Sequence, residues 1–281
     1  MTLEQALSIG DREVLSLVGG GGKTTLMYAL GRELSAHRKG IILTTTTKIW
    51  EPEPSPFFIQ FLSPDFDEIQ RWVAENIHGR RSLLIARERL PNGKLEGVPP
   101  GWVQDLFTMD GVSIIVNEAD GSAGRPLKAL REGEPVVPVN TTLLVPVMGI
   151  DGMGRTLDEE WVFRSAIASR LLDLPIGSLV TEEVIARLMK ELVKSCPPGA
   201  RVVPLINKVD IPGGLEKAQK LARYLLSTDP PGIRRVVLCR LRGFPAVKVI
   251  GEDLCSIGER RIVSHFESAR ERLPRGLPRG K

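Results

Sequence analysis

The sequence predicts a three-layer α/β fold in which helices cover both faces of a mostly parallel central sheet. Short runs that are predominantly apolar, such as residues 14–18, 112–116 and 143–149, recur along the chain. Strands that are buried on both faces of a sheet have this composition. Segments with helical patterns separate the runs, and parallel strands require such crossover connections.

The elements follow in a regular order from the first strand, at residues 14–18, which leads through a glycine run into a helix beginning at about Lys23. We expect further strands at residues 41–47, 82–86, 112–116, 143–149, 202–207 and 234–239. We expect further helices at residues 65–77, 101–109, 158–172, 181–194, 214–226 and 257–272. Residues 50–64 are rich in proline and are expected to be irregular.

We expect one domain spanning residues 1–281, because no clear linker and no internal repeat interrupt the chain. Within it, residues 50–110 form a partly irregular excursion. Residues 270–281 form a flexible tail, because their arginines are spaced by proline and glycine.

The composition is that of an ordinary globular protein, with 281 residues, 42% hydrophobic and 26% charged. The net charge of +4 suits anionic small ligands, but no basic patch interleaved with aromatic residues indicates a nucleic-acid partner. The three cysteines are far apart, which fits a reducing compartment. Neither a signal peptide nor an apolar stretch long enough to span a bilayer is present, so we expect a cytoplasmic protein without a membrane partner.

A glycine loop between the first strand and the first helix predicts a phosphate-binding site. Glycines let backbone N–H groups turn toward an anion without a Cβ in the way, and the helix N-terminus adds its positive dipole end. The lysine can reach the outer phosphates of a nucleotide, and a threonine hydroxyl can ligate Mg²⁺. The residues concerned are Gly19, Gly20, Gly21, Gly22, Lys23, Thr24 and Thr25.

The loop is a shortened form of the common phosphate-binding loop (P-loop), because Leu17 stands where the longer form has its first glycine. The alternative interpretation is a glycine-rich turn that carries a lysine by chance. The combination of apolar strand, glycine run, Lys-Thr and amphipathic helix favours a nucleotide site, with GTP or ATP and Mg²⁺ as ligands.

Glu118, Asp120 and Gly121 directly follow the strand at residues 112–116, where ligands of such sheets bind. A carboxylate there can hold Mg²⁺ or polarise an attacking water, and the Gly121 N–H can reach a γ-phosphate. We therefore assign catalytic roles to Lys23, Glu118 and Asp120, and metal-binding roles to Thr24, Glu118 and Asp120. The alternative is a plain acidic turn.

A second polar group, Asn207, Lys208 and Asp210, ends the strand at residues 202–207. An Asp at a base edge can accept both N–H donors of guanine and meets the adenine ring nitrogen unfavourably, so it discriminates between the two. Asn207 can brace the loop and Lys208 can lie over the ring. The alternative is a capped turn before Pro212.

Two further groups of polar residues have open interpretations. Residues 44–47 are threonines that either form a good β segment or turn their hydroxyls toward phosphate or Mg²⁺. Arg125 and Lys128 either hold an anionic second substrate or a transition-state phosphate, or are ordinary surface charges.

Five short strings resemble the YqeC family of accessory proteins for selenium cofactors or selenium-dependent molybdenum hydroxylases. They are GGGGKTT (residues 19–25), TTTTK (44–48), EADGSAGRPLKA (118–129), GEP (133–135) and GIDGMGRTL (149–157). The resemblance implies a P-loop NTPase that acts in hydroxylase maturation, with a molybdenum hydroxylase or its cofactor as partner. Phe163 and Arg164 stand where the family has a His-Arg pair, so we expect no catalytic histidine at that point.

The Glu118-x-x-Gly121 and Asn207-Lys208-x-Asp210 patterns are less specifically similar to signatures of dimeric metallochaperone GTPases for nickel and cobalamin enzymes. That resemblance implies a metallochaperone-GTPase-like fold, GTP as the nucleotide and a homodimer as one arrangement. Those GTPases have a longer phosphate loop and an Asp after the second strand, where this chain has threonine. The shortened loop looks more like that of ATP-using amide ligases of cell-wall synthesis.

The sequence therefore supports three hypotheses. The first is a Mg²⁺-dependent P-loop nucleotide hydrolase that serves selenium-dependent molybdenum hydroxylases, with GTP favoured over ATP. The second is an ATP-dependent kinase or ligase that activates a small acceptor held by Arg125 and Lys128. The third is a module that binds a nucleotide or the molybdenum cofactor without hydrolysis.

Overall fold

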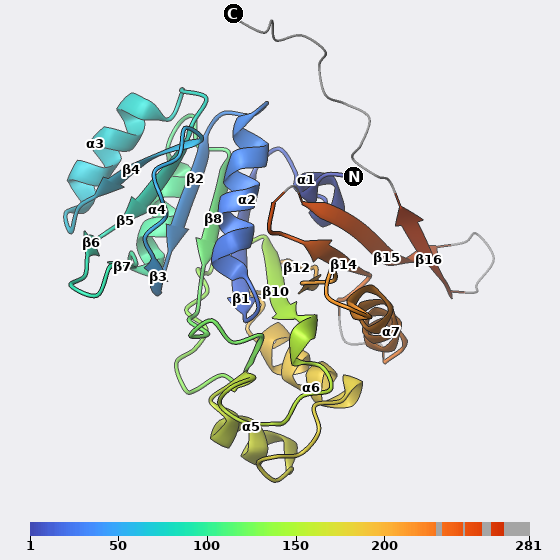
Figure 1. Ribbon diagram of the computed structural model, residues 1–281. Coiled ribbons are helices and arrows are strands. Elements are labelled where there is room, and N and C mark those ends of the chain that lie inside the picture. Colours follow the sequence, from blue (N-terminus) through green and yellow to red (C-terminus); the bar gives the residue numbers. More distant parts are fainter. Residues whose placement is uncertain (229–231, 244, 255–259, 267–281) are drawn as a thin grey trace, which may run out of the picture.

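A computed structural model describes residues 1–228, 232–243, 245–254 and 260–266. Its centre is one large sheet of 11 strands (Figure 1). These strands are β1 (Glu13–Gly19), β2 (Ile41–Thr45), β4 (Phe58–Leu62), β5 (Ser82–Ala86), β8 (Ile114–Glu118), β10 (Leu143–Gly149), β12 (Arg201–Val202), β13 (Leu205–Asn207), β14 (Arg235–Arg240), β15 (Ala246–Leu254) and β16 (Arg260–Phe266).

The strand order in the sheet is β16-β15-β14-β13-β10-β1-β8-β2-β5-β4, with β12 paired to β10. Every pair from β14 to β4 is parallel, and only β15 and β16 run antiparallel to their neighbours. Strand β1 lies in the middle, because β10 and β8 pair with its two edges. The glycine loop therefore leaves the sheet at its centre.

Two small sheets and seven α-helices complete the described part of the chain. The small strands are β3 (Lys48–Trp50), β6 (Glu88–Arg89), β7 (Lys94–Glu96), β9 (Leu127–Lys128) and β11 (Val162–Phe163). The helices are α1 (Leu3–Leu7), α2 (Lys23–Ser35), α3 (Phe66–Asn76), α4 (Pro100–Thr108), α5 (Ser165–Leu172), α6 (Glu182–Val193) and α7 (Gly214–Ser227), with a 3-10 turn η1 at Ile150–Gly152.

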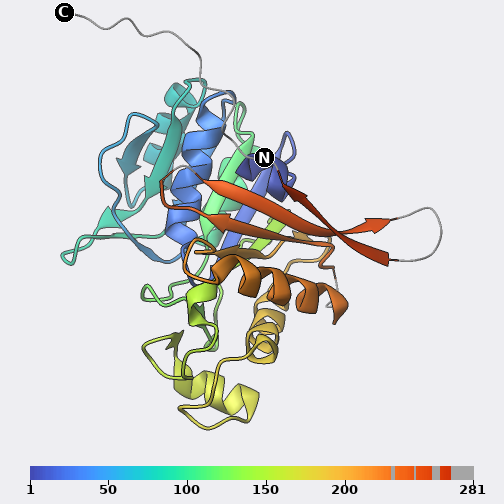
Figure 2. The same ribbon diagram turned by 45° about the vertical axis from the view of Figure 1, so that its right-hand side comes forward.

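Alternating residues of the central strands pack against helices on opposite faces, which confirms the predicted α/β fold with three layers. On one face Val14 of β1 shares a core with Ile69 of α3 and Val103 of α4. On the other face Leu15 shares a core with Leu26 of α2. Helices α6 and α7 cover a third core over β10, β13 and β14 (Figure 2).

Residues 58–62 were expected to be irregular and instead form the edge strand β4, parallel to β5. The prolines at positions 52, 54 and 56 all precede the strand, and the segment FIQFL itself carries none. Aromatic and β-branched residues favour a half-buried strand, and this strand is partly buried throughout.

The helix expected at residues 158–172 begins only at Ser165. The Asp158 carboxylate accepts hydrogen bonds from the N–H groups of Glu160 and Trp161, and such local bonds compete with a helix. The strand expected at residues 202–207 is split into β12 and β13, because Pro204 has no N–H for a sheet bond.

The helix expected at residues 257–272 is wrong where it can be examined, because residues 260–266 form strand β16. Ile262 and Val263 are β-branched, and the whole segment pairs antiparallel with β15. The remainder of that expected helix, and the tail at residues 270–281, lie outside the described residues.

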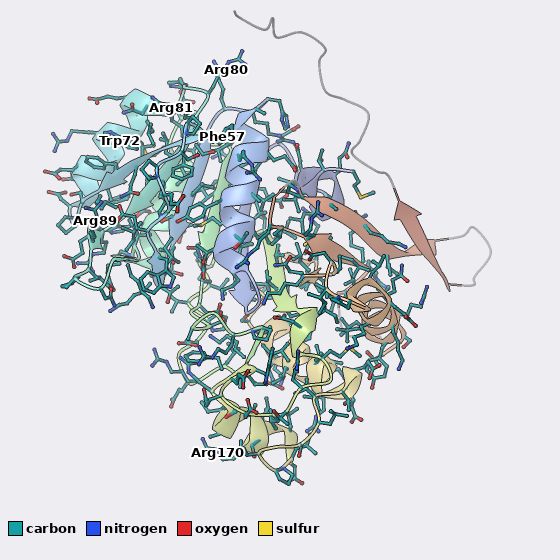
Figure 3. The ribbon with its side chains drawn as sticks, viewed as in Figure 1. Phe57, Trp72, Arg80, Arg81, Arg89 and Arg170 are labelled. Carbon is teal, nitrogen blue, oxygen red and sulfur yellow. The ribbon has the colours of Figure 1, made fainter. Side chains whose placement is uncertain are left out.

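The carboxyl ends of the parallel strands meet at one edge of the sheet, and the lobe with α5 and α6 lies beyond that edge (Figure 1). Arg80 and Arg81 lie at the far end of the α3–β5 connection, away from this edge (Figure 3). Within the described residues, no helix is long and apolar enough to cross a membrane.

Candidate functional site

The glycine loop after β1 is packed too closely for any side chain. Gly19, Gly21 and Gly22 have φ angles of 98°, 73° and 131°, values that residues with a Cβ rarely adopt. A Cβ on Gly21 would lie 2.1 Å from the backbone nitrogen of Gly149. The glycines therefore let the loop press against the end of β10.

Three N–H groups of the loop are used inside the protein. The Gly19 N–H donates to both carboxylate oxygens of Asp120 at 3.0 Å. The N–H groups of Gly20 and Gly21 donate to backbone oxygens of neighbouring segments at 2.9 Å each. These bonds fix the shape of the loop.

The next four N–H groups, of Gly22, Lys23, Thr24 and Thr25, meet no acceptor within the described part of the chain. They lie at the N-terminus of α2, where the first N–H groups of a helix have no partner in the helix itself. Four such donors together with the helix dipole form an anion-binding position. The positions that can hold a phosphate are thus shifted from Gly19–Gly22 toward Gly22–Thr25.

All four residues line a cavity of about 610 Å³ at the carboxyl edge of the sheet. The other lining residues come from the glycine loop, from β3 and β7, and from the ends of β8, β13 and β14 with the loops that follow them. They are Gly21, Lys48, Ile49, Trp50, Lys94, Glu118, Gly121, Ser122, Ala123, Gly124, Asn207, Lys208, Asp210, Ile211, Arg240, Leu241 and Arg242. Six of the side chains that line the cavity are basic and only two are carboxylates. This charge balance suits a polyanion.

Lys23 lines the cavity and is only 2% exposed. Its Nζ donates to the Gly19 carbonyl and lies 3.2 Å from Asp120 and 3.7 Å from Glu118. The ammonium is thus held by the glycine loop and by the carboxylates at the end of β8 and just after it, next to the N–H groups at the start of α2. From that position it can exchange a carboxylate for a phosphate oxygen.

Thr24 and Glu118 form the pair that can hold Mg²⁺. The Thr24 hydroxyl donates to Glu118 Oε2 at 2.7 Å, and both residues line the cavity. Mg²⁺ prefers oxygen ligands and usually takes one or two from the protein, with phosphate and water oxygens completing the shell. Burial raises the pKa of Glu118, and the nearby Lys23 charge opposes that shift.

Asp120 is also buried, but it does not line the cavity. Its carboxylate binds the Gly19 N–H, lies 3.2 Å from Lys23 and pairs with Lys128 at 2.9 Å. With these partners it fixes the loop and the lysine from behind. Gly121, one residue on, does line the cavity, and its carbonyl accepts from Lys128 at 2.7 Å.

The ion pairs continue away from the cavity to Glu134 and Arg164. Lys128 Nζ lies 2.8 Å from Glu134, which also accepts two hydrogen bonds from Arg164 at 2.6 and 2.8 Å. Burial alone would raise the pKa of Glu134, but the hydrogen bonds from Arg164 and Lys128 outweigh it and hold the pKa at about 2. Arg164 thus has a structural partner, and Phe163 beside it packs under the Arg164 guanidinium.

The polar loop after β13 borders the other end of the cavity. The Asn207 side chain donates to the Gly21 carbonyl at 2.8 Å and accepts from the Leu241 N–H at 3.2 Å. Lys208 has a left-handed backbone with φ 67° and pairs with Asp151 at 2.6 Å. Asp210 is exposed and lines the cavity. Asn207 therefore ties this loop to the glycine loop and leaves Asp210 open to a ligand.

Arg125 and Lys128, considered above as anchors for a second substrate, do not line the cavity. Arg125 donates to the carbonyls of Glu159 and Ala123, at 2.8 Å each. The Lys128 side chain has no exposed surface. The hydroxyls of Thr44, Thr45 and Thr46 donate to backbone carbonyls, as in a simple β segment.

Two groups of cavity residues were not predicted from the sequence: Arg240 and Arg242 at and after the end of β14, and Lys48, Trp50 and Lys94 on β3 and β7. For the second group the sequence does contain a strand pattern, because Lys48-Ile49-Trp50 and Lys94-Leu95-Glu96 alternate between polar or aromatic and aliphatic residues. The proline-rich segment that follows Trp50 led us to expect irregular structure there instead.

Comparison with known proteins gives the family. A family model described as YqeC protein matches residues 15–166. A YqeC protein of Escherichia coli (strain K12) is 30% identical over 198 residues, which cover 69% of this chain and 75% of that protein. The chain belongs to the YqeC family. The residues matched by the YqeC model include the glycine loop, the acidic loop, Glu134 and Arg164, and they end before the Asn207 loop.

Proposed function

We propose that this YqeC family member is a Mg²⁺-dependent P-loop nucleotide hydrolase. The observation that carries the proposal is the row of four N–H groups at Gly22, Lys23, Thr24 and Thr25, which have no acceptor among the described residues and open into a basic cavity. Phosphates would bind at these donors, because a helix N-terminus and oriented amides stabilise negative charge.

The side chains around the donors have complementary roles in the proposed reaction. Lys23 would move from Asp120 and Glu118 to the outer phosphates and neutralise charge that builds up there during transfer. Thr24 and Glu118 would hold Mg²⁺, which bridges phosphate oxygens and offsets their charge. Asp120, fixed between Lys23 and Lys128, would position the lysine and the Gly19 N–H.

We propose GTP as the nucleotide, with ATP as the alternative. Asp210 is exposed at the cavity, and its carboxylate can accept two hydrogen bonds from guanine. Adenine presents a ring acceptor at the same edge, so it would leave a polar group unpaired. Asn207 holds this loop against the glycine loop, and it would thereby set the distance between base and phosphates.

The cellular process that we propose is maturation of selenium-dependent molybdenum hydroxylases, which the family resemblance implies. Nucleotide turnover would drive synthesis or insertion of the selenium-containing ligand. The test is to purify such a hydroxylase from cells that contain the wild-type chain or its Lys23→Ala variant, and to measure bound selenium. Equal selenium content in the two preparations would contradict this role.

The hydrolase proposal is tested by phosphate release from GTP and ATP, with and without Mg²⁺. We expect release with Mg²⁺ that falls at least about a hundredfold in Lys23→Ala and Thr24→Val, a range typical for loss of one charge-stabilising group. Lys194→Ala is the matched control, because Lys194 is an exposed lysine outside the cavity. Binding of nucleotide without phosphate release would instead favour the non-hydrolysing module.

A further inference from the structure

The cavity extends beyond Glu118 to β3 and β7, two antiparallel strands that are far apart in the sequence and that we call the β3–β7 pair. In the sheet order, the Asn207 loop follows β13, the glycine loop follows β1, and Glu118 ends β8. Strand β2 lies next to β8, and β3 follows β2 after a turn of two residues. A nucleotide with its base at Asp210 and its phosphates at Gly22–Thr25 would therefore leave the β3 end of the cavity empty.

The β3–β7 pair presents one polar face to this end of the cavity. Lys48 pairs with Glu96, Ile49 with Leu95, and Trp50 with Lys94. Because strand residues alternate between faces, Lys48, Trp50 and Lys94 lie on one side. Ile49 and Leu95 lie on the other side and are buried at 2% and 0% exposure. The buried Ile49 and Leu95 thus hold the β3–β7 pair against the protein, and the residues of its other face are available to contact a ligand.

Trp50 is 63% exposed although it lines a cavity. The Lys94 Nζ lies 5.0 Å from the centre of its ring, and the Lys48 Nζ lies 3.2 Å from Glu96. An exposed indole ring binds planar rings by stacking, as aromatic side chains do with bases in nucleic-acid sites. The two lysines beside it supply positive charge for an anionic group.

We propose that Trp50, Lys48 and Lys94 form a subsite for a second substrate, an anionic molecule with a planar ring. The ring would stack on Trp50, and its anionic group would pair with Lys94 and Lys48. This subsite lies on the Glu118 side of the proposed phosphate position, and the outermost phosphate of a nucleotide with its base at Asp210 would point toward it. We assign the second substrate to this subsite and not to Arg125 and Lys128, because those two side chains bind other groups of the protein. The proposal rests on the proposed nucleotide site for its position relative to the phosphates.

The experiment is an isothermal calorimetric titration of the full chain with 1-naphthyl phosphate. It is carried out with and without saturating Mg²⁺ and GDP. Two matched probes separate the parts of the ligand: 1-naphthol keeps the ring and lacks the charge, and cyclohexyl phosphate keeps the charge and lacks the flat ring. We expect saturable binding of 1-naphthyl phosphate in the presence of GDP, with each matched probe at least about tenfold weaker, since each lacks about 1.4 kcal/mol of contacts.

Trp50→Ala and Lys94→Gln are expected to weaken 1-naphthyl phosphate binding by at least about tenfold and about threefold, respectively. Phe57→Ala is the control, because Phe57 is also an exposed aromatic residue but does not line the cavity and lies near Arg80 and Arg81 (Figure 3). Both variants keep Ile49 and Leu95, so the β3–β7 pair is expected to form in them.

Three results would overturn the subsite: no saturable binding, unchanged binding in Trp50→Ala, or competition between the probe and GDP, which would place the probe at the glycine loop. Failure of the nucleotide site gives a different pattern. In that case GDP does not bind, while 1-naphthyl phosphate still binds in a manner that depends on Trp50.

Discussion

Lys128→Met is the substitution whose cost follows most directly from the geometry. The Lys128 side chain is fully buried, and its Nζ lies 2.9 Å from Asp120, 2.8 Å from Glu134 and 2.7 Å from the Gly121 carbonyl. Methionine fills a similar volume without the charge, so the loss is electrostatic. Removing one partner of a buried ion pair costs about 3–5 kcal/mol. Because Asp120 keeps Lys23 and Glu134 keeps Arg164, we expect the lower end, about 3 kcal/mol.

The assay is equilibrium unfolding in urea, followed by tryptophan fluorescence. With a slope of about 3 kcal/mol per molar, the midpoint is expected to fall by about 1 M. Lys194→Met, at an ion pair whose lysine is 70% exposed, is the control and should change the free energy of unfolding by less than about 0.5 kcal/mol. Adding Asp120→Asn to Lys128→Met should recover part of the loss. A loss below about 1 kcal/mol for Lys128→Met would refute the buried position of its charge.

Three further predictions concern the site and its supports. Thr24→Val should abolish the Mg²⁺ dependence of nucleotide binding, measured by calorimetry, while lowering the free energy of unfolding by only about 1–2 kcal/mol. Gly21→Ala should prevent nucleotide binding and destabilise the chain by more than Gly177→Ala, because both glycines have positive φ but only Gly21 has backbone within 4 Å of its Cβ position. The lowered pKa of Glu134 means that its stabilisation is complete above its ordinary pKa of 4.5 and is lost as pH falls toward about 2. The urea midpoint of the wild type should therefore drop between pH 5 and pH 2 by more than that of Glu134→Gln.

The fold was predictable because its central strands are predominantly apolar. Residues 14–18, 82–86 and 143–149 could not form exposed or amphipathic elements, and they lie in β1, β5 and β10. The two wrong predictions, at β4 and β16, concern segments whose local sequence fits more than one structure. The prolines before β4 led to an expectation of irregular structure, and the residue pattern of β16 also fits a helix. Pairing decides both cases: β4 pairs with β5, which is remote in sequence, and β16 pairs with β15, the strand just before it.

The candidate site was predictable in its residues and less so in its geometry. Motif spacing brings Gly22, Lys23, Thr24 and Glu118 to one cavity, as expected for polar residues that follow parallel strands. It does not reveal that the N–H groups of Gly19 to Gly21 are used internally, or that Lys128 is enclosed between carboxylates. Those facts depend on the packing of the acidic loop behind the glycine loop. The same packing explains why the GEP string and Arg164 belong together, through the Glu134 ion pair.

Nucleotide binding at the glycine loop is the central claim, and equilibrium binding of GDP, GTP, ADP and ATP with Mg²⁺ tests it most directly. We expect guanine nucleotides to bind at least tenfold more tightly than adenine nucleotides, a difference of about 1.4 kcal/mol. Asp210→Asn should remove this preference, whereas Asp105→Asn, at an exposed carboxylate outside the cavity, should leave it unchanged. Equal or tighter adenine binding that ignores Asp210→Asn would contradict the base-recognition role. Failure of all four nucleotides to bind would contradict the account as a whole.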